Sequence, residues 1–192
     1  MSASEGAVPT GTRVSNVNVA NALTVLRIVL VPVFLAALFV DGGHDARWRW
    51  IAFAVFAIAM ITDRIDGQIA RRYGLITEFG KLMDPIADKA LTGAAFIGLS
   101  VLGDLPWWVT AVILARELGI TVFRFVVIRD GVIPASRGGK LKTLLQTIAI
   151  GLYLMPLQPW MDIPSAVVMG AAVVVTVWTG VDYLQSWWRA RR

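Results

Sequence analysis

Six apolar runs separated by short polar breaks dominate this 192-residue chain and limit the folds open to it. The runs cover approximately Leu23–Val40, Trp48–Thr62, Ala90–Leu102, Trp107–Ile128, Leu144–Met155 and Pro164–Leu184. Several of them approach the roughly 20 residues that a helix needs to cross a bilayer. The pattern therefore predicts an all-α integral membrane protein, built as a bundle of six transmembrane helices.

The composition supports a membrane protein. Charged residues make up 16% of the chain and hydrophobic residues 57%, whereas a soluble domain carries about 25% charged residues. The chain has no cysteine, which excludes disulfides and thiolate metal sites. Residues 1–15 are small and polar and are expected to form a disordered tail, followed by a single membrane domain over residues 16–192.

The distribution of positive charge predicts the orientation. Most cations of the connecting segments follow the second and fourth apolar runs, and three more lie at the C-terminal end. Because cytoplasmic loops carry an excess of lysine and arginine, both termini are expected on the cytoplasmic side of the plasma membrane. The segment after the second run is expected on the same side, and the net charge of +5 suits anionic lipid headgroups.

That segment after the second run holds four aspartates. Asp63 and Asp66 are three residues apart, and Asp84 and Asp88 are four apart, so on helices each pair shares one face. Carboxylates at the edge of a membrane span need partners, and divalent cations bound by oxygen ligands are the obvious ones. The sequence thus predicts a metal site on the cytoplasmic side of the bundle.

The same segment resembles the signature of the CDP-alcohol phosphotransferase family, D-x-x-D-G-x-x-A-R-x8-G-x-x-x-D-x-x-x-D. Every fixed position of the signature is filled, by Asp63, Asp66, Gly67, Ala70, Arg71, Gly80, Asp84 and Asp88. Members of this family are six-helix membrane enzymes that move a phosphatidyl group from a CDP-lipid to an alcohol and release CMP. The resemblance implies the same chemistry for this chain.

The resemblance also implies residue roles. Asp63, Asp66, Asp84 and Asp88 would ligate two Mg²⁺ ions, with Mn²⁺ as an alternative, and Asp88 would also be the general base for the acceptor hydroxyl. Gly67, Arg71 and Thr77 would contact the CDP part of CDP-diacylglycerol. The structural alternative is an ion-pair cluster of the aspartates with Arg64, Arg71, Arg72 and Lys89.

Three further segments resemble one branch of the family, the phosphatidylglycerophosphate synthases. They are Asn18–Arg27, similar to N-x-P-N-x-L-T-x-x-R with Ala20 in place of the proline, Ala115–Arg124, and Gly139–Gln146 with its G-K-x-K-T-x-x-Q pattern. The resemblance implies glycerol 3-phosphate as the acceptor. Within the first segment, the side chains of Asn21, Thr24 and Arg27 either cap a helix or touch the nucleotide.

An acceptor that carries a phosphate dianion needs fixed positive charge. The candidates for this contact are Arg116, Arg137 and Lys140, with Arg124 and Lys142 in reserve. The alternative interpretation treats these residues as ordinary cytoplasmic loop cations and pairs Arg116 with its neighbour Glu117.

Other functions remain open at this stage. Within the family, the acceptor could instead be an inositol phosphate, or phosphatidylglycerol as in a cardiolipin synthase. A divalent-cation transporter is a more distant alternative, although acids in a transport path are expected near the bilayer midplane. Membrane lipids are expected partners and nucleic acids are not, and the sequence leaves a homodimer open.

Overall fold

The computed structural model describes residues 19–73, 77–127 and 137–190. Within these ranges the chain forms six α-helices and two short 3-10 helices, and it has no strand, so the predicted all-α class is confirmed. The elements are α1 (Val19–Phe39), η1 (Val40–Gly43), α2 (Ala46–Tyr73), α3 (Glu78–Val101), α4 (Trp107–Val127), α5 (Arg137–Leu154), η3 (Pro159–Met161) and α6 (Asp162–Ala190). The tail predicted over residues 1–15 lies outside the described residues.

Each predicted apolar run coincides with one helix, but several helices extend well beyond their runs. Two helices in the described ranges are long and apolar enough to cross a membrane, over Asn21–Gly43 and Pro159–Arg189. The helices α2 and α3 also contain the polar segment, because α2 continues to Tyr73 and α3 begins at Glu78. The aspartates are therefore held on helices rather than in a loop.

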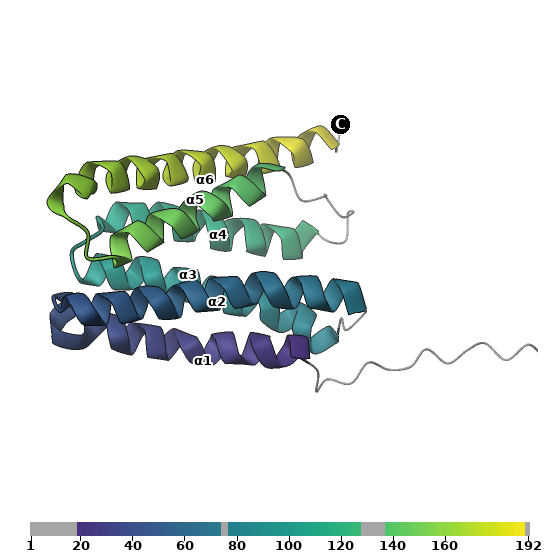
Figure 1. Cartoon of the computed structure of the whole chain (residues 1–192). Coiled ribbons are helices and arrows are strands. Elements are labelled where there is room, and N and C mark those ends of the chain that lie inside the picture. The colour runs from purple at the N-terminus through teal and green to yellow at the C-terminus, as the bar shows by residue number, and fades with distance from the viewer. Residues whose placement is uncertain (1–18, 74–76, 128–136, 191–192) are drawn as a thin grey trace, which may run out of the picture.

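The six helices run alternately up and down the bundle (Figure 1). At one end of the bundle, α1, α3 and α5 begin and α2, α4 and α6 end, while η1 and η3 lie at the opposite end. We call the first of these the aspartate end, because Asp63, Asp84 and Asp88 lie on the parts of α2 and α3 nearest to it. The two ends of the described chain thus lie on the same side of the bundle as the aspartates.

Apolar side chains fill the bundle between these ends. Helix α1 packs against α2 and α3, α6 packs against α4 and α5, and contacts of α5 with α2 and α3 join the two groups. The rings of Phe34 and Phe56 lie 6.0 Å apart, centroid to centroid. The largest fully buried apolar side chains are Phe34, Leu38, Phe56, Leu91, Phe96, Leu99, Leu105, Ile113, Ile150 and Leu154.

Polar contacts of one arginine connect the helices at the end of the bundle opposite the aspartates. Arg49 of α2 lies 2.7 Å from the carboxylate of Asp104, between α3 and α4, and its Nη2 also donates to the Tyr153 carbonyl of α5 at 3.3 Å. One guanidinium therefore links three segments of the bundle. Because the core and this contact fix the helices relative to one another, the polar residues at the aspartate end are held on a stable frame.

The outer faces of the helices expose large apolar side chains. Examples are Val25 and Val29 on α1 and Val167, Val174 and Trp178 on α6. Large contiguous apolar surfaces are rare on soluble monomers and typical of surfaces that face lipid or a partner. They occur here on the two helices whose length and hydropathy allow them to cross a membrane.

Candidate active site

Polar side chains of α1 hold two of the aspartates. Arg27 is fully buried, and its Nη1 lies 2.5 Å from Oδ1 of Asp63 on α2. Thr24, three residues earlier and so on the same helical face, donates its hydroxyl to Oδ1 of Asp84 on α3 at 2.6 Å. The sequence allows Thr24 and Arg27 to be either helix caps or nucleotide contacts. In the structure they instead hold the carboxylates of Asp84 and Asp63.

A third contact from α1 fixes the start of α3. Thr77 is the N-cap of this helix, and its hydroxyl accepts a hydrogen bond from the backbone N–H of Gly80 at 3.0 Å. The same hydroxyl contacts both atoms of the Asn21 amide, at 2.9 and 3.0 Å. A Cβ at Gly80 would lie only 2.8 Å from Oδ1 of Asn21, so this signature glycine allows α1 to approach α3 closely. The nucleotide contact expected of Thr77 stays a prediction.

The carboxylates at the aspartate end interact with one another. Both Asp63 and Asp88 lie beyond the apolar runs. Burial raises the pKa of the Asp88 carboxyl above its ordinary value, and the charge of Asp63 raises it further, against the cations Arg27 and Lys142. The pKa of Asp63 is raised mainly by burial, with Arg27 opposing the shift and Asp84 adding to it. Half-buried carboxylates that repel one another in this way favour a bound cation.

The donor chemistry of this group fits a magnesium ion, which prefers carboxylate oxygens. Among the described side chains, no group of three or more His, Cys, Asp or Glu residues is already gathered as a metal centre. The side chain of Asp66, the fourth predicted ligand, lies outside the described residues. The four-aspartate metal site stays a prediction.

Several other predicted residues have no described side chain. Gly67 and Arg71 lie on α2, Arg124 on α4 and Arg137 at the start of α5. Their helices all reach the aspartate end of the bundle (Figure 1). Their predicted contacts with nucleotide or acceptor stay predictions.

A cavity of about 920 Å³ opens at the aspartate end between five of the helices. Asp63 of α2 and Asp88 of α3 line it together with Arg116 of α4 and with Lys140 and Lys142 of α5. Its remaining charged and hydroxyl-bearing lining residues are Arg64, Lys89, Glu117, Thr121, Thr143, Thr147, Thr179 and Tyr183. The structure thus brings two predicted carboxylates and two predicted acceptor cations, Arg116 and Lys140, into one cavity.

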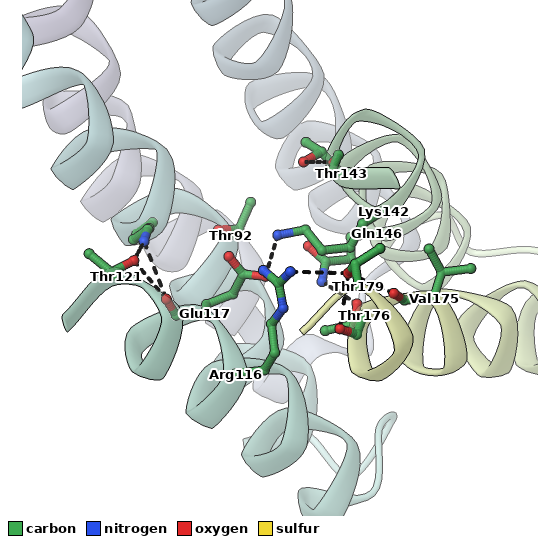
Figure 2. A network of polar contacts seen from close by, with 12 residues as sticks. Thr92, Arg116, Glu117, Thr121, Lys142, Thr143, Gln146, Val175, Thr176 and Thr179 are labelled. Carbon is green, nitrogen blue, oxygen red and sulfur yellow. Dashed lines mark hydrogen bonds and ion pairs between the residues drawn. The ribbon is translucent and has the colours of Figure 1, made fainter. Parts of the chain in front are cut away.

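Glu117 organises the cations of this cavity (Figure 2). Its Oε1 forms an ion pair with Lys142 of α5 and lies 3.3 Å from Nη1 of Arg116. The pairing of Arg116 with Glu117 that the sequence offered as an alternative is therefore present. It does not turn Arg116 away from the cavity, since both residues line it.

Lys142 is more central than the sequence suggested. Lys142 is only 7% exposed, whereas Lys140, which also lines the cavity, is exposed to solvent. Burial lowers the pKa of Lys142, and the charge and hydrogen bond of Glu117 oppose that shift. A buried lysine that keeps an acidic partner is better fixed for binding an anion than a mobile surface lysine. Lys142 therefore joins Arg116 as a principal cation of the cavity.

Asp63 and Asp88 line this cavity from α2 and α3, and Arg116 and Lys142 line it from α4 and α5. A small molecule that carries both a phosphate and a hydroxyl could bind its phosphate at Arg116 and Lys142 while its hydroxyl approaches Asp88. The sequence did not predict that Glu117 also pairs with Lys142 or that Thr179 lines this cavity. Glu117 was visible as the residue after Arg116, whereas Thr179 lies in a run with no distinctive pattern.

Comparison with known proteins identifies the family. The model of the CDP-alcohol phosphatidyltransferase family matches residues 17–178, which include all four signature aspartates and the candidate acceptor cations. The chain belongs to this family. It is therefore a membrane protein of a phosphatidyl-transferring enzyme family, which agrees with its two membrane-capable helices.

Three similar members of the CDP-alcohol phosphatidyltransferase family carry names that describe one activity. A probable phosphatidylglycerophosphate synthase of Mycobacterium tuberculosis is 62% identical over 167 residues, covering 87% of this chain and 80% of the relative. The CDP-diacylglycerol–glycerol-3-phosphate 3-phosphatidyltransferase of Bacillus subtilis is 36% identical over 186 residues, covering 90% and 96%. The enzyme of the same name from Rickettsia felis is 34% identical over 174 residues, covering 88% and 94%.

Proposed function

We propose that this protein transfers the phosphatidyl group of CDP-diacylglycerol to sn-glycerol 3-phosphate, which yields phosphatidylglycerophosphate and CMP in phospholipid biosynthesis. The observation that carries the proposal is the cavity in which Asp63 and Asp88 face Arg116 and Lys142. The names of the relatives from Mycobacterium, Bacillus and Rickettsia support the same donor and acceptor.

In this proposal Asp63, Asp66, Asp84 and Asp88 hold two magnesium ions, with manganese as an alternative. The bound ions would supply positive charge that grips the pyrophosphate and stabilises the attacking and leaving oxygens. Arg27 and Thr24 keep Asp63 and Asp84 in place from α1. Gly67, Arg71 and Thr77 contact the CDP part of the lipid, as the family signature implies.

The chain's own residues then account for the proton and the acceptor. The hydroxyl oxygen of glycerol 3-phosphate attacks the phosphorus of the phosphatidyl group, and Asp88 accepts the proton of that hydroxyl. The bond from that phosphorus to the oxygen it shares with the CMP phosphate breaks, and CMP leaves with the bonding electrons. The half-buried position of Asp88 on the cavity wall suits a group that receives a proton from bound substrate.

Arg116, Lys140 and Lys142 bind the phosphate of glycerol 3-phosphate, with Arg137 as a further candidate. Arg116 is best suited, because it lines the cavity and because Nη1 and Nη2 each use one N–H for Glu117 and Thr179. Each of these two nitrogens carries a second N–H, which would bind a ligand oxygen. Glu117 holds Lys142 and Arg116 together before the acceptor binds.

The proposal also covers the arrangement of the chain in the membrane. We propose that all six helices of a single domain, residues 16–192, cross the plasma membrane, with both termini and the aspartate end in the cytoplasm. Glycerol 3-phosphate then reaches the cavity from the cytoplasm, while the acyl chains of CDP-diacylglycerol stay in the bilayer. Membrane lipids contact the apolar outer faces, and a homodimer is compatible with this arrangement.

An acceptor panel tests the function. The purified full-length chain is supplied with CDP-diacylglycerol and magnesium, and CMP release is measured with glycerol 3-phosphate, inositol phosphate or phosphatidylglycerol. We expect glycerol 3-phosphate to give the highest kcat/KM. A preference for either other acceptor would keep the family chemistry and refute the proposed substrate, and absence of CMP release with all three would refute the enzyme.

The contact of Arg116 with the acceptor gives a sharper prediction. Arg116→Ala should raise the KM for glycerol 3-phosphate by about tenfold or more, since a charge-assisted contact is worth roughly 1.5–3 kcal/mol. The KM for CDP-diacylglycerol should change little. Arg49→Ala removes a part-buried, ion-paired arginine at the opposite end of the bundle and is the matched control. An unchanged acceptor KM in folded Arg116→Ala would return this arginine to a structural role.

A further inference from the structure

Helix α6 contributes a polar stripe to the cavity wall, although its sequence is otherwise generic. Thr176, Thr179, Gly180 and Tyr183 recur at intervals of three and four residues and therefore share one helical face. Thr176 is fully buried, Thr179 is 4% exposed, and Thr179 and Tyr183 line the cavity. The family model ends at residue 178, so Thr179 and Gly180 lie just beyond the matched region.

Thr179 holds the guanidinium of Arg116. Nη2 of Arg116 donates to Oγ1 of Thr179 at 3.0 Å, across 63 residues of sequence (Figure 2). The Thr179 hydroxyl itself points its proton back to its own helix, toward the carbonyls of Val175 at 2.7 Å and Thr176 at 3.1 Å. The oxygen is thereby oriented as an acceptor, which is what a guanidinium donor requires.

Gly180 makes room for the stem of the same arginine. A Cβ at this position would lie 3.1 Å from Cγ and 3.3 Å from Nε of Arg116, closer than ordinary van der Waals contact. The arginine side chain therefore lies directly against the backbone of α6. Any larger residue at this position would push the stem, and with it the guanidinium, by a few tenths of an ångström.

The neighbouring turn of α6 fixes the other cation-bearing helix. Nε2 of Gln146 on α5 donates to Oγ1 of Thr176 at 2.9 Å, and Gln146 lies one turn beyond Lys142 on the same face of α5. One stripe of α6 thus sets the position of Arg116 on α4 and of the helix that carries Lys142. Uncharged residues of α6 therefore set the positions of both Arg116 and Lys142.

We infer that Thr179 and Gly180 are positioning residues, which place the Arg116 guanidinium for the phosphate of the acceptor. The inference rests on the proposed function, because it presupposes that Arg116 binds that phosphate. Thr179 anchors one end of the planar guanidinium, and Gly180 leaves room for its stem where Arg116 lines the cavity. The pair therefore sets affinity for the acceptor and leaves the donor site and the transfer step unchanged.

The test is a double-mutant cycle with steady-state kinetics of CMP release, with glycerol 3-phosphate and CDP-diacylglycerol each varied. Thr179→Val removes the hydroxyl at nearly constant shape and should raise the acceptor KM by about fivefold, the scale of one lost hydrogen bond. The donor KM and kcat should stay within about twofold, and Thr179→Ser should restore the acceptor KM. In an Arg116→Ala background, Thr179→Val should have no further effect.

Control variants keep the outcomes distinct. Thr110→Val makes the same change at a buried threonine of α4, bonded to Ser100 and Phe96 outside the cavity, and should leave the acceptor KM unchanged. Gly180→Ala should raise the acceptor KM in the native background and not beside Arg116→Ala. This variant carries the test if Thr179→Val does not fold.

Two results would overturn the inference. One is an unchanged acceptor KM in Thr179→Val or Gly180→Ala when Arg116→Ala raises it, which would leave the proposed function intact. The other is an equal rise in both backgrounds, which would mean that α6 acts independently of Arg116. An unchanged KM in Arg116→Ala itself would instead refute the proposed acceptor contact, and the positioning role with it.

Discussion

Asp88→Asn is expected to lower kcat for CMP release by at least about 100-fold, the low end for the loss of a general base. Asparagine keeps the size of the side chain and an oxygen that can contact a cation, but it cannot accept the proton of the glycerol hydroxyl. Binding of CDP-diacylglycerol should remain nearly native and dependent on magnesium. Steady-state kinetics together with equilibrium binding of the lipid to the purified variant measure the two effects separately.

The matched control is Asp104→Asn, which makes the same change at the opposite end of the bundle, where Asp104 pairs with Arg49. It should leave kcat within a few-fold of native. If Asp88→Asn loses lipid binding in step with activity, Asp88 is primarily a metal ligand. If kcat is unchanged, the proton goes elsewhere and the role assigned to Asp88 is wrong.

Chelation is expected to have an equally large effect. Exhaustive treatment with EDTA should abolish CMP release, and added magnesium or manganese should restore it, because the aspartates repel one another without cations and the pyrophosphate then has no counter-charge. EDTA already saturated with magnesium is the control for effects of the chelator itself. Full activity after exhaustive chelation would contradict the two-metal proposal.

A variant of one aspartate tests the same site without a chelator. Asp84→Asn weakens a predicted ligand and relieves carboxylate repulsion, so the protein should stay folded while the magnesium concentration for half-maximal activity rises. Thr24 can still donate to the asparagine oxygen, so the position of the side chain on α3 is retained. An unchanged magnesium requirement would remove Asp84 from the set of ligands.

The sequence determined the fold class and the place of the site along the chain. Apolar runs of membrane length have few stable solutions other than packed helices, so the six runs predicted the six helices described. The aspartate spacing was informative for a similar reason, since a three- or four-residue interval fixes a shared face on any helix. Both signals are local, and local signals can be interpreted without knowing how the helices pack.

The tertiary structure decided which side chains meet. Arg27 and Asp63 lie 36 residues apart in sequence, Thr24 and Asp84 60 apart, and Arg116 and Thr179 63 apart, and no local pattern predicts such pairs. The sequence ranked Lys142 behind Lys140, because it could not show that one turn of α5 buries the first and exposes the second. None of the segments that carry the family resemblance reaches α6, and a threonine and a glycine in an apolar helix have no chemical signature. Their position beside Arg116 follows only from the way α6 packs on α4, where the absence of a side chain at Gly180 and one hydroxyl at Thr179 accommodate the arginine.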